Sequence, residues 1–99
     1  MAAERNLEIY LVEQVKKVGG RAYKFVSPGY AGVPDRICVF PGGKIVFVEL
    51  KADETKKPTP LQQCQMNKLL QLGCEVHLIG SREKVNQLIN FYGGADRDF

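Results

Sequence analysis

The sequence has no tryptophan, only one histidine (His77), and three cysteines that form no CxxC pair. This spacing argues against a zinc site or a disulfide framework, so we expect Cys38, Cys64 and Cys74 to be buried, reduced thiols. No run of about 18 apolar residues is present to span a membrane, and the first residues, MAAERNLEIY, are charged and amphipathic, unlike a signal peptide. We therefore expect an intracellular protein with no membrane partner.

Acidic residues are missing from two stretches, residues 14–34 and 55–74, although the net charge of the chain is only +3. The basic residues in these stretches are Lys16, Lys17, Arg21, Lys24, Lys56, Lys57 and Lys68. Such a distribution is common on ordinary solvated surface, and it also attracts a polyanion such as DNA. Charge alone leaves both interpretations open.

The chain is long enough for one small hydrophobic core, because it has 99 residues of which 44% are hydrophobic. We therefore expect a single domain over residues 1–99. Apolar periodicity and turn residues predict a helix at 3–18, strands at 21–26, 35–40 and 44–51, a helix at 60–72, a strand at 74–80, a helix capped by Ser81 that ends near Gly93, and a flexible tail at 93–99. This αβββαβα order predicts an α/β domain with a central mixed sheet flanked by helices.

Charged residues interrupt an otherwise apolar predicted hairpin, VPDRICVFPGGKIVFVELKA, at residues 33–52. A three-residue turn sets Asp35 opposite Glu49, whereas a two-residue turn sets it opposite Leu50 and diagonal to Glu49. Either register brings the two carboxylates close together. Since side chains alternate along a strand, Lys51 projects from the same face as Glu49.

Opposed carboxylates repel each other and are costly to remove from water unless they share a cation. A hard divalent ion with oxygen ligands, Mg²⁺ or Mn²⁺, meets this need. Alternatively, Lys51 neutralises one carboxylate in a structural ion-pair cluster at the edge of the sheet. The hairpin by itself does not choose between a metal site and such a cluster.

Polar residues on the two predicted helices accompany the hairpin. Glu8 lies on the apolar stripe of the first helix, so its carboxylate either leans toward the body of the protein or bends out to water. Thr59 and Gln62 match a capping box at the start of the second helix. Gln62 can satisfy the helix backbone in that motif, and it can also point inward.

Asp35 lies in GVPD, and after 13 intervening residues the chain continues with ELK, at Glu49 to Lys51. This pattern resembles the PD-(D/E)xK nuclease signature. Together with the Glu8 helix and TPLQ at residues 59–62, it resembles the VRR-NUC family, the virus-type replication and repair nuclease domains, in the stand-alone form of phages and bacteria. The resemblance covers residues 4–80.

The resemblance implies a restriction-endonuclease-like fold and divalent-metal-dependent hydrolysis of phosphodiester bonds, with Mg²⁺ or Mn²⁺ as cofactor. It implies a homodimer acting on branched DNA, such as four-way (Holliday) junctions, in the cytoplasm of a bacterial or phage-infected cell. The implied metal ligands are Asp35, Glu49, the backbone carbonyl of Leu50, and Glu8, which would hold the metal or its waters. Lys51 would position or activate the attacking water, and Gln62 would orient Lys51 or the nucleophile.

Basic residues are the candidates for contacts with the DNA backbone: Lys16, Lys17, Arg21, Lys24, Lys56 and Lys57. Arg36 alternates away from Asp35 and either supports the other face of the sheet or contacts DNA. Tyr30 either stacks on a base at a branch point or folds onto its own loop. We expect His77 to be structural and Phe91 to lie in the core or at its boundary.

Backbone contacts carry no sequence information, so we expect the protein to recognise DNA shape. The alternatives are a general nicking or duplex endonuclease, a non-catalytic nucleic-acid-binding module of the same fold, and a protein-interaction domain with structural charges.

Overall fold

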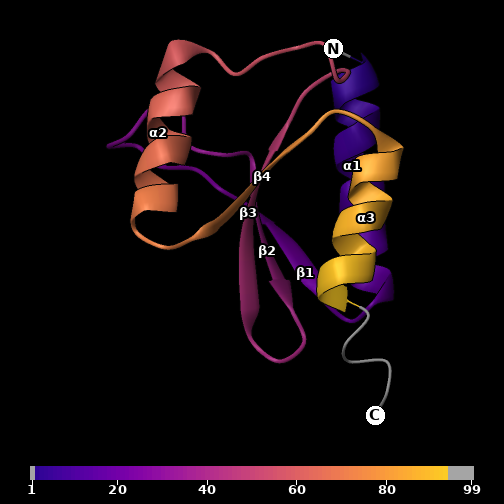
Figure 1. Cartoon of the computed structure of the whole chain (residues 1–99). Coiled ribbons are helices and arrows are strands. Elements are labelled where there is room, and N and C mark those ends of the chain that lie inside the picture. The colour runs from indigo at the N-terminus through magenta and orange to yellow at the C-terminus, as the bar shows by residue number, and fades with distance from the viewer. Residues whose placement is uncertain (1, 94–99) are drawn as a thin grey trace.

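The computed structural model describes residues 2–93, and these residues follow the predicted αβββαβα order (Figure 1). The elements are α1 (Ala2–Lys17), β1 (Arg21–Lys24), β2 (Arg36–Phe40), β3 (Lys44–Leu50), α2 (Pro60–Gln71), β4 (Glu75–Ile79) and α3 (Arg82–Gly93). β1 ends two residues earlier than predicted. Gly93 belongs to α3, and the rest of the predicted tail lies outside the described residues.

The strands form one mixed sheet, as predicted, and their order in it is β1-β2-β3-β4. β1, β2 and β3 are antiparallel, and β4 runs parallel to β3. Phe40 pairs with Lys44 across the hairpin turn, so the turn has three residues and the register is the one that sets Asp35 opposite Glu49. Gly42 and Gly43 have φ angles of 90° and 83°, a region that favours glycine, and this explains the turn sequence.

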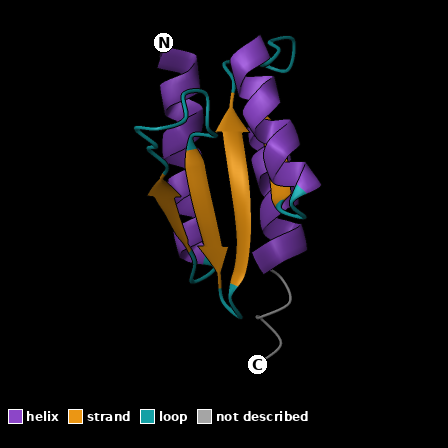
Figure 2. Ribbon diagram, turned by 90° about the vertical axis from the view of Figure 1, so that its left-hand side faces the viewer, coloured by secondary structure: helices purple, strands orange, loops and turns teal. Residues whose placement is uncertain are grey.

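Helices cover the two faces of the sheet unequally. Figures 1 and 2 show α2 on one face and α1 with α3 on the other. The core lies between the sheet and the α1/α3 pair, and its buried residues are Leu7, Leu11, Val15, Ala22, Cys38, Phe40, Val46, Val48, Leu50, Ile79, Val85, Leu88, Ile89 and Tyr92. α2 buries only Met66. The side chains on the α2 face of the hairpin are therefore outside the main core.

This unequal packing corrects two predictions. Cys38 is buried and Cys74 is half-buried, but Cys64 is exposed, because it lies on α2, whose apolar contact with the sheet is narrow. Phe91 is 74% exposed, because it lies on the outer side of α3 while its neighbour Tyr92 faces the core. Among the described residues, no helix is both long and apolar enough to cross a membrane.

Candidate active site

The two motif carboxylates meet where β2 begins and β3 ends. Asp35 directly precedes β2, one step beyond the last paired residues, Arg36 and Val48. The backbone N–H of Leu50 therefore has no strand partner on that side, and it donates instead to Asp35 Oδ2 at 2.9 Å. This bond fixes the Asp35 carboxylate against the end of β3, next to Glu49.

Glu49 is a buried acid, with only 2% of the residue exposed. One carboxylate oxygen, Oε2, lies 3.5 Å from Lys51 Nζ. The other, Oε1, is buried without a hydrogen-bond partner. Burial, and next the charge of Asp35, raise the pKa of Glu49 from its ordinary value of 4.5 to about 7. A buried carboxylate oxygen without a donor is costly, so it calls for a proton or a cation.

The pKa of Asp35 is also raised, by burial and by a neighbouring negative charge. Burial raises its pKa most, the hydrogen bond from Leu50 lowers it, and the charge of Glu8 raises it. The charge of Glu8 therefore acts on Asp35, and the charge of Asp35 acts on Glu49. The positive charges of Lys51 and Arg36 offset them only in part, since the pKa of Asp35 stays above its ordinary value.

Gln62 connects Lys51 to the start of α2. The capping box is present, with Thr59 Oγ1 accepting from Gln62 N at 3.2 Å and Gln62 Oε1 accepting from Thr59 N at 2.9 Å. Lys51 Nζ donates to the same Gln62 Oε1 at 2.7 Å. Since both neighbours are donors, the amide oxygen must face them, and both of its acceptor positions are used. The two roles considered for Gln62, capping and pointing inward, are therefore combined.

Glu8 and Arg36 pair on the α1 face of the sheet. Arg36 Nε donates to Glu8 Oε2 at 2.8 Å, and its terminal nitrogen donates to the Ala22 carbonyl at 3.1 Å. Arg36 thus supports the sheet, which is one of the two roles considered for it. Sequence reasoning missed its pairing with Glu8. Strand alternation was the available signal, because it turns Arg36 away from Asp35 and toward α1.

The donor set fits a hard divalent cation held by few protein ligands. Across residues 2–93, no three His, Cys, Asp or Glu side chains converge as a metal cage. The candidate ligands are therefore the Asp35 and Glu49 carboxylates with the Leu50 carbonyl. The unpartnered Oε1 of Glu49 is the observation that supports the fit, because oxygen ligands of this kind suit Mg²⁺ and Mn²⁺.

Some predicted DNA contacts lie far from the carboxylates. Arg21 pairs with Val39 near the hairpin turn, at the opposite end of the β1–β2 ladder from Asp35. Lys16 and Lys17 end α1, directly before this end of β1. The structure therefore does not place these three basic residues together with Asp35 and Glu49.

Other predicted contacts lie near the carboxylates. Lys24 pairs with Arg36 at the end of the β1–β2 ladder that adjoins Asp35. Lys56 and Lys57 are exposed on the loop that connects Lys51 to α2, and Tyr30 is 67% exposed on the loop that precedes Asp35. Lys56, Lys57 and Tyr30 are therefore exposed on segments that adjoin Lys51 or Asp35, whereas Lys24 lies on the α1 face, where it lines a pocket with Glu8 and Arg36.

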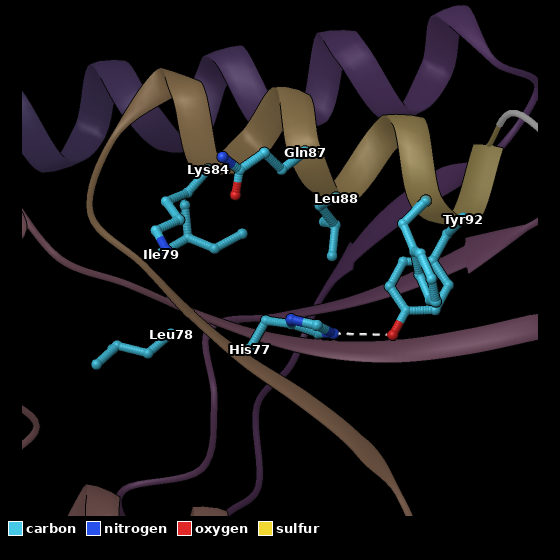
Figure 3. Close-up of a pocket in the computed structure, with 8 residues that line it drawn as sticks. His77, Leu78, Ile79, Lys84, Gln87, Leu88 and Tyr92 are labelled. Carbon is cyan, nitrogen blue, oxygen red and sulfur yellow. Dashed lines mark hydrogen bonds between the residues drawn. The ribbon is translucent and has the colours of Figure 1, made fainter.

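A separate pocket lies on the opposite face of the sheet. It has a volume of about 340 Å³ and is formed by β4 and α3 (Figure 3). There, His77 Nε2 lies 2.9 Å from the Tyr92 hydroxyl, which donates to Glu75 Oε1 at 2.7 Å. His77 is thus a satisfied structural histidine, as predicted. No carboxylate lines this pocket, so the carboxylate site on the α2 face remains the candidate active site.

Two known proteins are similar to this chain, one in sequence and one in both sequence and fold. The chain is 50% identical over 80 residues to a protein described as "Putative nuclease p44" of Acyrthosiphon pisum secondary endosymbiont phage 1, and the match covers 81% of this chain and 85% of that protein. A solved structure described as "VRR_NUC domain" superimposes with a TM-score of 0.86 at 34% identity, covering 91% of this chain and 97% of the other. No family model matches the sequence. The two likenesses, together with the carboxylate site, identify the chain as a member of the VRR-NUC family of nucleases.

Proposed function

We propose that this nuclease is an endodeoxyribonuclease that depends on Mg²⁺ or Mn²⁺ and hydrolyses phosphodiester bonds in branched DNA, such as four-way junctions, as a homodimer. The observation that carries the metal dependence is the buried Glu49 carboxylate, whose Oε1 has no partner, next to Asp35. A purely structural ion-pair cluster usually satisfies its buried oxygens, so the unpaired Oε1 favours a bound cation.

Asp35, Glu49 and the Leu50 carbonyl would hold the cation. When bound, the cation supplies positive charge beside the scissile phosphate and makes water more acidic. The protein contributes the fixed positions of the ligands, since the Leu50 N–H orients Asp35 and burial among neighbouring side chains orients Glu49. Holding the ligands before the substrate arrives reduces the reorganisation needed during the reaction.

Lys51 is the group that we place against the reacting phosphate. Its ammonium is held between Gln62 Oε1 at 2.7 Å and Glu49 Oε2 at 3.5 Å. A positive charge at this position stabilises the negative charge that develops on the phosphate oxygens and orients the attacking water. Gln62 accepts from Lys51 and is a positioning residue. Glu8 adds negative charge beside Asp35, and Arg36 holds the Glu8 carboxylate in place by a hydrogen bond.

The proposed substrate is DNA recognised by its shape. Lys56 and Lys57, on the loop after Lys51, are exposed and suit contacts with phosphate, and Lys24 is exposed on the α1 side of the same end of the sheet. Such contacts position the protein on DNA without reading bases. The proposed homodimer would suit this substrate, because two sites related by a two-fold axis can cut two strands of a junction symmetrically.

Cleavage of end-labelled substrates tests the reaction. A four-way junction, a nicked duplex, a plain duplex and single-stranded DNA are incubated at equal concentration with Mg²⁺, Mn²⁺ or EDTA. We expect paired cuts in the junction that require the metal and are absent from linear duplex. Lys51→Ala should abolish the cuts, and Lys84→Ala, which removes an exposed lysine on α3, should not.

The other outcomes separate the alternatives. Equal cutting of junction and duplex would favour a general nicking or duplex endonuclease. Junction binding without cutting in either metal would favour a non-catalytic module. Cutting that persists in EDTA would contradict the metal dependence directly.

Metal binding is tested independently by titration calorimetry with Mn²⁺. We expect wild-type protein to bind the ion, and Glu49→Gln to weaken binding strongly while keeping the shape of the side chain. Glu83→Gln, an exposed acid on α3, serves as the matched control and should bind Mn²⁺ as wild type does. Equal Mn²⁺ affinity of all three proteins would contradict the site.

A further inference from the structure

An apolar groove lies on the α2 face between α2 and the loop of residues 25–33. Its volume is about 380 Å³, and its apolar walls are Phe25, Tyr30, Val33, Leu69 and Leu72. Figure 1 shows this loop, after β1, reaching to the side of α2. Neither the predicted catalytic residues nor the main core accounts for the groove, because the core lies on the opposite face of the sheet.

The loop is held firmly against α2. Gly32 has a φ of 85°, and a Cβ there would lie 2.9 Å from Leu61 Cγ and 3.0 Å from the Leu61 carbonyl oxygen. Only glycine permits this close approach without a shift of the helix or the loop. The groove is therefore largely formed before any ligand arrives.

Residues that line the groove adjoin the candidate active site. Phe25 N donates to the backbone carbonyl of Asp35 at 2.9 Å. The Phe25 ring also packs against Phe47, with ring centroids 5.7 Å apart, and Phe47 precedes Glu49 by two residues on the same face of β3. On the other side, Gln65 lines the groove one helical turn after Gln62. A ligand in the groove would therefore lie beside the carboxylates.

The chemistry of the groove suits a flat aromatic ring attached to an anion. No acidic residue lines it, and both chain segments that form it, 25–34 and 60–72, lack acids altogether. Lys68 lies at the groove and can attract a phosphate. Tyr30 is 67% exposed, so its ring is not folded away onto its own loop and is available for stacking.

We propose that this groove binds one unpaired nucleobase of the DNA substrate, stacked on Tyr30, adjacent to the phosphate that is cut. The inference rests on the proposed function, because it assumes a DNA substrate, and it names what makes a branch point recognisable. Unstacking a base costs least where it is already unpaired, as at a branch or a strand end. Gln65 and Ser27 offer hydrogen bonds to the base edge, and the apolar walls cover its faces.

The experiment uses DNA with 2-aminopurine at one unpaired position beside a branch, because the fluorescence of this base changes on stacking. The wild-type protein is titrated in EDTA, so that no cleavage intervenes. We expect a saturable fluorescence change. Tyr30→Ala should weaken binding of this DNA about 5- to 150-fold, the range for loss of one aromatic stacking contact.

Control variants isolate the groove. Tyr30→Phe keeps the ring and should retain the fluorescence change, whereas Phe91→Ala removes an equally exposed ring from α3 and should alter nothing. Tyr30→Ala should change affinity for a fully paired duplex less than about twofold, because that DNA offers no free base. Circular dichroism and thermal melting confirm that each variant is folded.

Several outcomes would overturn the inference. No fluorescence change with wild-type protein, or an equal loss of affinity for paired and unpaired DNA in Tyr30→Ala, would do so. A dimer that becomes monomeric in Tyr30→Ala, measured by sedimentation, would assign the groove to a second copy of the chain.

The fluorescence is read without metal, so it is separate from cleavage. Junction cleavage without a base-stacking signal would contradict the groove inference and leave the proposed nuclease function standing. A Tyr30-dependent signal without cleavage supports the inference and defeats the proposed catalysis.

Discussion

Lys51 Nζ donates a 2.7 Å hydrogen bond to Gln62 Oε1, and this bond joins the end of β3 to the first turn of α2. The same amide oxygen caps the helix through Thr59 N. One side chain therefore links the local structure of α2 to the orientation of the proposed catalytic ammonium.

We predict that Gln62→Ala lowers kcat about 10- to 100-fold with little change in KM, because a misplaced Lys51 loses stabilisation of the transition state more than of the ground state. Thr59→Ala is the control. It removes the helix cap, at a cost of about 1 kcal/mol in the free energy of unfolding, but keeps the acceptor for Lys51. Steady-state cleavage kinetics and urea denaturation measure both effects. Equal kcat values for the two variants would show that Gln62 acts only through helix stability.

The buried Glu49 predicts how stability depends on pH without metal. Its pKa rises from 4.5 in the unfolded chain to about 7 in the folded one, so the folded state binds more protons between these values. The free energy of unfolding should therefore fall as pH rises through this window, by about 3 kcal/mol in total, and be highest below it. The raised pKa of Asp35 acts in the same direction.

Thermal melts in EDTA from pH 5 to pH 8 measure this dependence. Glu49→Gln should flatten it, because the amide does not titrate. Mn²⁺ added at pH 8 should raise the melting temperature of wild type and leave that of Glu49→Gln unchanged. His77, whose pKa is lowered by burial, acts in the opposite direction but titrates in both proteins. The same pH dependence for wild type and Glu49→Gln in EDTA would therefore refute the pKa direction assigned to Glu49.

Two pairs of adjacent lysines give a matched test of where DNA lies. We expect Lys56→Ala/Lys57→Ala to weaken junction binding and to reduce the slope of log affinity against log salt concentration by about 2, since two phosphate contacts are lost. Lys16→Ala/Lys17→Ala removes the same charge from the far end of α1 and should leave the slope nearly unchanged. Fluorescence anisotropy at several salt concentrations measures the slopes. Equal slope changes would mean that the DNA path extends to the hairpin turn.

The pairing of Glu8 with Arg36 is tested by a double-mutant cycle. Their side chains are only 25% and 19% exposed, so removing one partner leaves a partly buried charge beside Asp35. We expect Arg36→Ala to destabilise the protein by about 1 to 2 kcal/mol, and the double variant with Glu8→Ala to lose less than the sum of the two single losses. Additive losses in urea denaturation would mean that the pair is not coupled in solution.

Local sequence chemistry predicted much of the fold. The turn glycines predicted the hairpin but left two registers open, and the structure shows the three-residue turn. TPLQ predicted the cap of α2, because a cap depends on neighbouring residues only. Both registers bring Asp35 close to Glu49, so the meeting of these carboxylates was predicted before the register was known. The family resemblance added the roles of these residues, which spacing alone left open.

Properties that depend on distant packing were not predictable in this way. Helical spacing shows which residues share a face, but not how much of that face the sheet covers. Cys64 and Phe91 are exposed for this reason. The Glu8–Arg36 pair joins residues 28 positions apart, and it depends on how α1 lies across the sheet.

The one-sided core places the residues that stabilise the fold and the residues of the proposed active site on opposite faces of the sheet. Residues that face α1 and α3 form the hydrophobic core, whereas the α2 face carries the charges and a helix that buries only Met66. Local opening of α2 would therefore expose little apolar surface, and its amide hydrogens should exchange with solvent sooner than those of the central strands. The packing of α1 and α3 against the sheet therefore supplies most of the apolar burial that stabilises the fold, and α2 contributes little to it.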